Sequence, residues 1–273
     1  TKHELVSNAR HGVRSPKLHR SVAPGHGTRR PVLPSDDALV LWTSGTSGMP
    51  KGVVLSHQSL LANAKAKLRA VPQRPDDHRH TVLSISHAYA RTCDLGTWLI
   101  SGCSLSIGRG YRGWSEYLQQ TRRTSELPTH CNMVPSLAER VLTNGPIPSS
   151  LAVLGCGGAA MRSESFHQWS RRGVKVIQGY GLTEAGPVIA SQTPDDSIPG
   201  RVGQFVEGWD YKIRNERLHL RGNSLFTRYV NDAEGTEPTA ARQGWFDTGD
   251  LVAICPESGQ LQILGRADDR ITL

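Results

Sequence analysis

The segment TSGTSGMPKG, residues 43–52, combines hydroxyls, glycines and one lysine in a single short loop. Gly45 and Gly48 allow tight turns whose backbone N–H groups point inward, and Lys51 adds a mobile positive charge. The available hydroxyl donors are those of Thr43, Ser44, Thr46 and Ser47. The loop therefore predicts phosphate binding. It differs from a Walker loop, because Gly52 follows the lysine where that motif has a magnesium-binding Ser or Thr. The metal ligand must lie elsewhere in the chain.

Two glycine-containing segments could approach a nucleotide base. Residues 178–184, QGYGLTE, follow a strand-like run and supply the Tyr180 ring for stacking and the Glu184 carboxylate for magnesium. Residues 155–159, GCGGA, form a turn of small residues that a ligand could approach closely. In an open parallel sheet such turns lie at the strand ends, where ligands bind.

Two further segments could hold a sugar and phosphate. Residues 244–251, GWFDTGDL, offer the Asp250 carboxylate to the two hydroxyls of a ribose. Residues 264–271, LGRADDRI, offer the Arg266 guanidinium to ribose or phosphate. Taken singly, these residues also have plainer explanations, since Asp250 could cap a turn and Glu184 could stabilise a helix N-terminus.

The hydrophobic pattern predicts an α/β fold that positions these segments. Strand-like runs alternate with helix-like runs between residues 38 and 178, which is typical of a mainly parallel sheet with flanking helices. From residue 201 the runs become short and alternating, which predicts a small antiparallel β-barrel or sandwich. We expect a strand at residues 81–85, preceded by a solvated loop containing His78, Arg79 and His80.

These patterns divide the chain into three parts. Residues 1–36 read as a basic, disordered linker, residues 37–200 as the α/β nucleotide-binding region, and residues 201–273 as the small β subdomain. The net charge of +8 arises largely in the first part, so we do not expect nucleic-acid binding by the rest. The five cysteines are widely spaced and predict buried reduced thiols. No transmembrane run or signal-peptide pattern is seen, and a cytoplasmic location is expected.

The motifs, in this order, resemble those of the acyl-adenylate-forming (AMP-binding) superfamily, which includes acyl-CoA synthetases, luciferases and peptide-synthetase adenylation domains. The resemblance covers residues 36–273. It implies that the loop from Thr43 to Lys51 binds the β and γ phosphates of ATP. It also implies that adenine lies against Gly157, Gly158, Ala159, Gln178, Gly179 and Tyr180.

The resemblance further implies roles around the reacting atoms. Thr183 would contact the α-phosphate and Glu184 would hold Mg²⁺, while Asp250 and Arg266 would bind ribose and phosphate. His87, in SHAYART, matches the histidine near the reacting carboxylate, although alone it would read as an ordinary packed or surface histidine. The implied catalytic set is Lys51, Thr183, Glu184 and His87.

The activity that the resemblance implies is ATP-dependent activation of a small carboxylic acid. A carboxylate attacks the α-phosphorus, giving an acyl-adenylate and pyrophosphate, and coenzyme A then accepts the acyl group as a thioester. SHAYART and PTHCNMVPSLAERVL are similar to segments of long-chain fatty acyl-CoA synthetases, whereas QGYGLTEAGPV is as close to the aryl and coumarate ligases. A fatty or other apolar acid is expected, with an aryl acid as the alternative. A carrier-protein thiol is an alternative acceptor.

The family runs longer than this chain. It has a region before the phosphate loop and a mobile domain after the hinge at Asp268, and we expect this chain to lack both and to adenylate poorly. Two alternatives of other classes remain, which are a non-catalytic nucleotide-binding remnant and a nucleic-acid-binding module led by the basic N-terminal arm.

Overall fold

The computed structural model describes residues 30–43, 50–121, 127–230 and 244–269. The predicted linker up to residue 29 lies outside these ranges. So do six residues of the predicted phosphate loop, namely Ser44, Gly45, Thr46, Ser47, Gly48 and Met49.

The main sheet has seven strands in the order β4-β3-β5-β6-β7-β8-β9. Neighbouring strands from β4 to β7 are parallel, and β7-β8 and β8-β9 are antiparallel. This confirms the predicted α/β fold with a mainly parallel sheet. The bounds are His78–Thr81 for β3, Ser104–Ile107 for β4, His130–Met133 for β5, Val153–Cys156 for β6, Lys175–Gly181 for β7, Val188–Ser191 for β8 and Gln204–Phe205 for β9.

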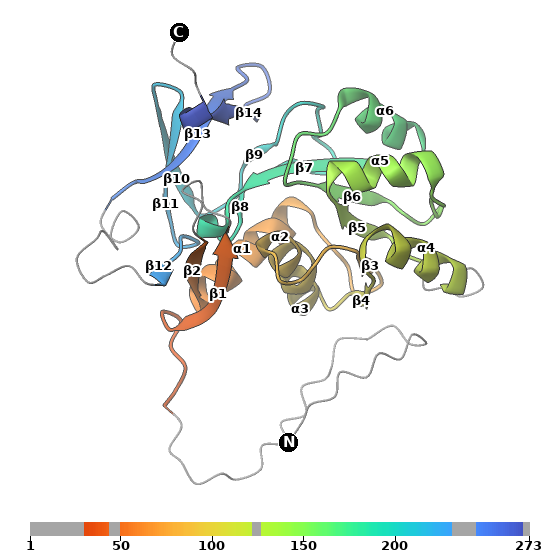
Figure 1. The fold of residues 1–273 in the computed structure, drawn as a ribbon, viewed down its shortest axis with the longest axis horizontal. Helices are drawn as coiled ribbons and strands as arrows, with labels where there is room; N and C mark the ends of the chain where they lie inside the picture. Colours follow the sequence, from red (N-terminus) through yellow and green to blue (C-terminus); the bar gives the residue numbers. More distant parts are fainter. Residues whose placement is uncertain (1–29, 44–49, 122–126, 231–243, 270–273) are drawn as a thin grey trace.

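Helices cover both faces of this sheet (Figure 1). On one face α4, α5 and α6 enclose a core in which Trp114, Met133 and Trp169 are fully buried. On the other face lie α1 and α3, and α2 and the π-helix η1 lead directly into α3. The bounds are His57–Ala70 for α1, Ala88–Ala90 for α2, Arg91–Gly96 for η1, Thr97–Ser101 for α3, Gly110–Thr121 for α4, Pro135–Asn144 for α5 and Ser163–Arg171 for α6.

Helix α1 begins directly after a capping residue, Ser56. The Ser56 hydroxyl accepts a hydrogen bond from the Ser59 backbone N–H at 3.1 Å, which satisfies one of the free donors of the first turn. The chain before β1 also contacts this end of the helix, since the Gln58 N–H donates to the Pro34 carbonyl at 2.8 Å.

Two smaller antiparallel sheets complete the fold. One has the order β1-β2-β12, and the other has the order β10-β11-β13-β14. The second confirms the antiparallel structure predicted after residue 201, and its apolar face packs with β8 around Ile189, Leu218 and Val252. The bounds are Asp37–Thr43 for β1, Lys51–Ser56 for β2, Trp209–Arg214 for β10, Arg217–Gly222 for β11, Arg228–Val230 for β12, Phe246–Ile254 for β13 and Leu261–Arg266 for β14.

Strand β3 corrects the sequence-based expectation. The segment His78–His80, predicted as a solvated loop, forms this strand with Thr81, and all four residues are buried. On the face toward α4, the Ser106 hydroxyl lies 2.8 Å from both His78 Nε2 and His80 Nδ1. The His80 ring also stacks on Tyr117, with ring centroids 4.1 Å apart. Specific partners thus replace the water that these polar side chains would otherwise need.

The opposite face of β3 carries a buried ion pair. Arg79 donates to one oxygen of Asp94 and Thr81 to the other, each at 2.7 Å, and the Asn132 amide donates to Asp94 at 2.7 Å as well. Burial raises the pKa of Asp94 despite these partners. Removing one member of such a pair is costly, because it leaves a buried charge without a partner.

Four of the five cysteines confirm the prediction of buried reduced thiols. Cys93, Cys103, Cys131 and Cys156 are free and buried, whereas Cys255 is free but only half-buried. Burial raises the pKa of Cys93 to about 11, so this thiol stays protonated at neutral pH. Among the described residues, no helix combines the length and apolarity required to cross a membrane.

The buried histidine of β3 predicts sensitivity to acid. Burial lowers the pKa of His80 to about 3, whereas an unfolded histidine titrates near 6.5. The stability that depends on neutral His80 is therefore fully present above pH 6.5 and is lost as the pH falls toward 3. We expect His80→Gln to reduce the slope of the free energy of unfolding against pH by about 1.4 kcal/mol per pH unit. Urea unfolding between pH 7 and 4.5 measures this slope.

The control for this prediction is His167→Gln. His167 lies exposed on α6, so its replacement should leave the pH slope unchanged. Burial also lowers the pKa of His130, to about 4, so part of the dependence of stability on pH remains in both variants. A His80→Gln slope equal to that of the wild type would contradict the prediction.

Candidate nucleotide site

Strand pairing fixes both ends of the predicted phosphate loop. Thr43 at the end of β1 pairs with Lys51 at the start of β2, and the Thr43 hydroxyl lies 3.5 Å from the Lys51 carbonyl. Residues 44–49 between them lie outside the described residues. The two ends of the loop therefore form an antiparallel hairpin, and Lys51 lies at its base within the described residues.

Lys51 and Glu184 contact the same tyrosine. The Lys51 ammonium lies 5.3 Å from the ring centroid of Tyr229, and the Tyr229 hydroxyl lies 3.0 Å from Glu184 Oε1. The turn that carries Thr183 and Glu184 is the 3-10 helix η2, Thr183–Ala185, which follows β7 directly. Lys51, predicted to contact phosphate, lies on β2, and Glu184, predicted to bind magnesium, lies on η2. Both contact Tyr229 of β12.

The backbone around η2 is held by long-range hydrogen bonds. The Phe226 N–H donates to the Glu184 carbonyl at 2.8 Å. The fully buried Asn63 amide of α1 donates to the carbonyls of Ala185 and Val188 at 3.1 and 2.8 Å, and it accepts from the Val188 N–H at 2.8 Å. The segment from Ala185 to Val188, with its cis peptide at Gly186–Pro187, is therefore fastened to α1.

Asp250, predicted to bind ribose, lies at the centre of a second cluster. It pairs with Arg266 across β13 and β14, and Arg266 Nη1 donates to Asp250 Oδ1 at 3.0 Å. The Tyr180 hydroxyl donates to the other oxygen, Oδ2. Burial, and then the Asp250 carboxylate, raises the pKa of the Tyr180 phenol well above its usual value. The phenol is consequently a proton donor at neutral pH.

The predicted adenine residues lie at the ends of neighbouring strands. Gly157, Gly158 and Ala159 follow β6 directly, and Gly158 has a φ of 83°, which favours glycine. Gln178 and Gly179 lie on β7, next to β6 in the sheet. The parallel pairing of β6 with β7 thus brings the two predicted adenine segments to the same sheet edge.

His87 lies apart from the contacts described above. It is exposed and precedes α2, with no side-chain hydrogen bond to cap that helix. Tyr89, two residues further on, reaches the predicted adenine turn, because a β-carbon at Gly157 would lie only 3.2 Å from its ring. The stretch after His87 therefore borders the predicted site through Tyr89.

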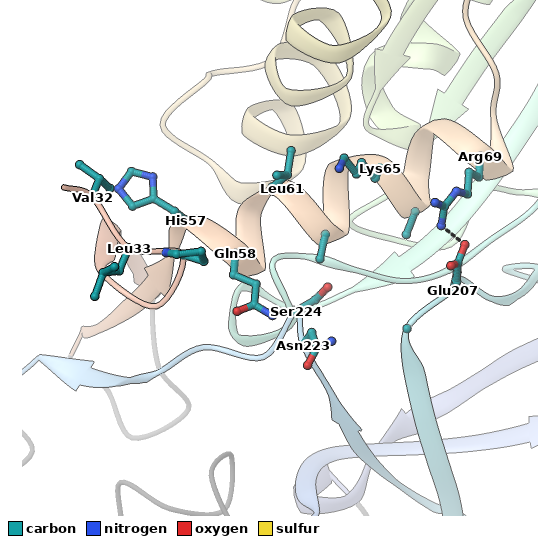
Figure 2. Close-up of a pocket in the computed structure, with 14 residues that line it drawn as sticks. Val32, Leu33, His57, Gln58, Leu61, Lys65, Arg69, Glu207, Asn223 and Ser224 are labelled. Carbon is teal, nitrogen blue, oxygen red and sulfur yellow. Dashed lines mark hydrogen bonds and ion pairs between the residues drawn. The ribbon is translucent and has the colours of Figure 1, made fainter.

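A pocket of about 560 Å³ lies elsewhere, along α1 (Figure 2). Leu61 and Lys65 of the helix line it, and the Arg69 guanidinium pairs with the Glu207 carboxylate at one end. None of the residues predicted to bind the nucleotide lines this pocket. The candidate site is thus defined by converging side chains and strand ends.

Residues 3–229 match the family described as AMP-binding enzyme, which is most of the chain. The chain belongs to the AMP-binding enzyme family. It is 30% identical to 4-coumarate–CoA ligase 3 of Arabidopsis thaliana over 261 residues, covering 86% of this chain and 46% of that protein.

Two solved structures have the same fold. A malonyl-CoA ligase with methylmalonyl-CoA and AMP bound is 26% identical, with a TM-score of 0.74 over 87% of this chain and 54% of that one. The O-succinylbenzoate coenzyme A synthetase of Bacillus subtilis, in complex with ATP and magnesium, is 23% identical, with a TM-score of 0.77 over 88% and 52%. The chain spans about half the length of the curated relatives it matches.

The family motifs did not indicate three residues that shape the site. Asn63 and Tyr229 act across long stretches of sequence, and their partners are visible only in the folded chain. Tyr89 lies two residues after His87 in SHAYART, so its place in that motif was the one sequence signal for it.

Replacing Asn63 tests how η2 is held. Asn63→Leu leaves the Ala185 carbonyl and the Val188 N–H without these hydrogen bonds, and the Val188 carbonyl keeps only the Trp209 indole as a donor. We expect the free energy of unfolding to fall by about 3 kcal/mol. Asn144→Leu, at an exposed position at the end of α5, should change it by less than about 0.5 kcal/mol. Urea unfolding at neutral pH measures both values, and equal stability of the two variants would refute the role of Asn63.

Proposed function

We propose that this protein takes part in the ATP-dependent activation of a carboxylic acid through an acyl-adenylate, followed by transfer of the acyl group to coenzyme A. The observation that carries the proposal is the Asp250 cluster, in which Tyr180 and Arg266 hold both carboxylate oxygens beside the end of β7. Family membership supports the same reaction type.

In the proposed complex, the nucleoside lies along the carboxyl ends of β6 and β7. Adenine would lie between Tyr180 and the turn at Gly157 and Gly158, where the backbone of small residues allows close approach. Asp250 would accept hydrogen bonds from the ribose hydroxyls, and Arg266 would hold Asp250 in place. Ala159, Gln178 and Gly179 would line the same edge.

The phosphates would lie toward β2 and η2. Lys51 would contact the β and γ phosphates with the loop before it, and Thr183 would contact the α-phosphate. In the described ranges, no group of three His, Cys, Asp or Glu residues could enclose a metal ion. This fits magnesium, which is commonly held by one carboxylate, here Glu184, together with phosphate oxygens. When bound, the ion would offset negative charge on the phosphates.

The reacting acid would lie beside His87 and Tyr89. The sequence around His87 predicts a fatty or other apolar acid, whereas the relatives compared above carry the names of aryl and dicarboxylic acid ligases. The names of these relatives support a compact acid. The fatty acid is the competing prediction.

The proposal also covers the acyl acceptor and the cellular location. Coenzyme A is the proposed acceptor, since each relative compared above is a coenzyme A ligase by name, and a carrier-protein thiol is the alternative. Free buried cysteines favour a reducing compartment, so a cytoplasmic location is proposed.

Loss of the Asp250 charge should weaken AMP binding. Asp250→Asn removes a charge-assisted acceptor, but ribose hydroxyls would exchange with hydrogen bonds that Asp250 already accepts from Tyr180 and Arg266. We therefore expect the AMP dissociation constant to rise about 3- to 10-fold, measured by isothermal titration of the chain. The matched control is Asp210→Asn, because Asp210 forms an exposed ion pair with Arg221 on β10 and β11. Equal AMP affinity in both variants would argue against a ribose site at Asp250.

Pyrophosphate release tests the reaction and the acid together. The complete gene product would be incubated with ATP, Mg²⁺ and a panel of hydroxycinnamic, benzoic, dicarboxylic and long-chain fatty acids. We expect release with a compact aryl or dicarboxylic acid at least ten times faster than with a fatty acid. Faster release with fatty acids would support the competing substrate, and no release with any acid would refute the ligase function.

A further inference from the structure

Tyr229 connects the two charged residues nearest the proposed phosphates. Its hydroxyl lies 3.0 Å from Glu184 Oε1, and its ring faces the Lys51 ammonium at 5.3 Å from the centroid. We propose that Tyr229 is a positioning residue, which orients the Glu184 carboxylate for magnesium and holds Lys51 at the base of the phosphate loop. This inference rests on the proposed function, because it assigns an orienting partner to the proposed metal ligand.

The tyrosine is held firmly enough to serve this purpose. Its backbone pairs with Val53 in the centre of β2, so Lys51 and Tyr229 lie on adjacent antiparallel strands. Its ring packs against Phe226 with centroids 4.7 Å apart, and Phe226 packs against Phe246 at 5.5 Å. Strand pairing and aromatic packing together limit the positions that the ring can adopt.

The same aromatic cluster fixes Glu184 at two points. The Phe226 N–H donates to the Glu184 carbonyl, and the Tyr229 hydroxyl contacts the Glu184 carboxylate. Phe226 and Tyr229 are close in sequence and flank the start of β12, so the backbone and side chain of Glu184 are held by one short segment. A carboxylate held in this way is already oriented before the cation binds.

Chemistry supports a donor at this position. A phenol that donates to Oε1 leaves Oε2 of Glu184 with its lone pairs available for a cation. Hydrogen bonds to a metal-binding carboxylate orient it, and their loss commonly costs 10- to 100-fold in metal affinity. The ring adds a second effect, since the face of an aromatic ring attracts an ammonium group such as that of Lys51.

The two charges also contact different parts of the ring. Lys51 lies over the face and Glu184 contacts the hydroxyl, and none of the ion pairs between described residues joins Lys51 to Glu184. A direct pair would use the carboxylate oxygens for the ammonium. Separate contacts with Tyr229 keep the lysine available for phosphate and the acid available for magnesium.

The test is the magnesium dependence of ATP binding by the chain. Tyr229→Phe removes the hydroxyl and keeps the ring beneath Lys51. We expect the Mg²⁺ concentration that gives half of the maximal ATP binding to rise about tenfold, measured by isothermal titration across a Mg²⁺ series. AMP binding without magnesium should change by less than about twofold, because it does not involve the carboxylate.

Two further variants separate orientation from general damage. Tyr211→Phe removes the hydroxyl of an exposed tyrosine on β10 and should leave the Mg²⁺ dependence as in the wild type. Glu184→Gln should raise the Mg²⁺ requirement by itself, and adding Tyr229→Phe to it should give no further increase. Such non-additive effects are expected if the Tyr229 hydroxyl acts through Glu184.

The possible failures are distinguishable. Wild-type protein that binds no ATP with magnesium would overturn the proposed function and this inference with it. Wild-type protein that binds ATP, beside a Tyr229→Phe variant with unchanged Mg²⁺ dependence, would overturn the inference alone. An equal loss of AMP and magnesium–ATP binding in Tyr229→Phe would also overturn it, because that result indicates a structural role without orientation of Glu184.

Discussion

Pairing of β2 on both of its edges is the constraint on which the candidate site depends. The Thr227 N–H and hydroxyl both donate to the Val54 carbonyl, at 2.8 and 3.2 Å, across 173 residues of sequence. Closing so long a loop costs conformational entropy, which burial of Val53 and Leu55 between the neighbouring elements offsets. This pairing brings Tyr229, which contacts the Glu184 carboxylate, to the hairpin that carries Lys51.

Burial of polar groups is the second organising feature. Asn63 in α1 and Asp94 in η1 are fully buried, and each makes three hydrogen bonds to partners that are distant in sequence. In the low-dielectric interior such groups tolerate few alternative arrangements, because every alternative leaves a donor or acceptor without a partner. They therefore specify one packing of the helices on the sheet, and Asn63 extends that specificity to the turn carrying Glu184.

The sequence predicted the parts of the fold that alternate in hydrophobicity and missed those that do not. Runs such as residues 174–178 were identified as strands, whereas β3 was missed because HRHT is polar on both faces and is stabilised by partners far along the chain. Strand β12 was missed because three residues carry too little pattern. Glycines and acids at fixed spacing gave the candidate site, but Tyr229 lies 45 residues from Glu184 and no local pattern links them.

The Asp250 cluster limits how much the ribose could contribute to binding. Both carboxylate oxygens already accept hydrogen bonds, from Tyr180 and Arg266, so ribose hydroxyls in the proposed complex would share or replace existing bonds. An exchange of one hydrogen bond for another gains much less than a new one. The larger part of the nucleotide affinity would then come from the phosphates, where Lys51 and Glu184 carry full charges. Since those two residues contact Tyr229, the pairing of β12 with β2 controls the stronger half of the proposed site.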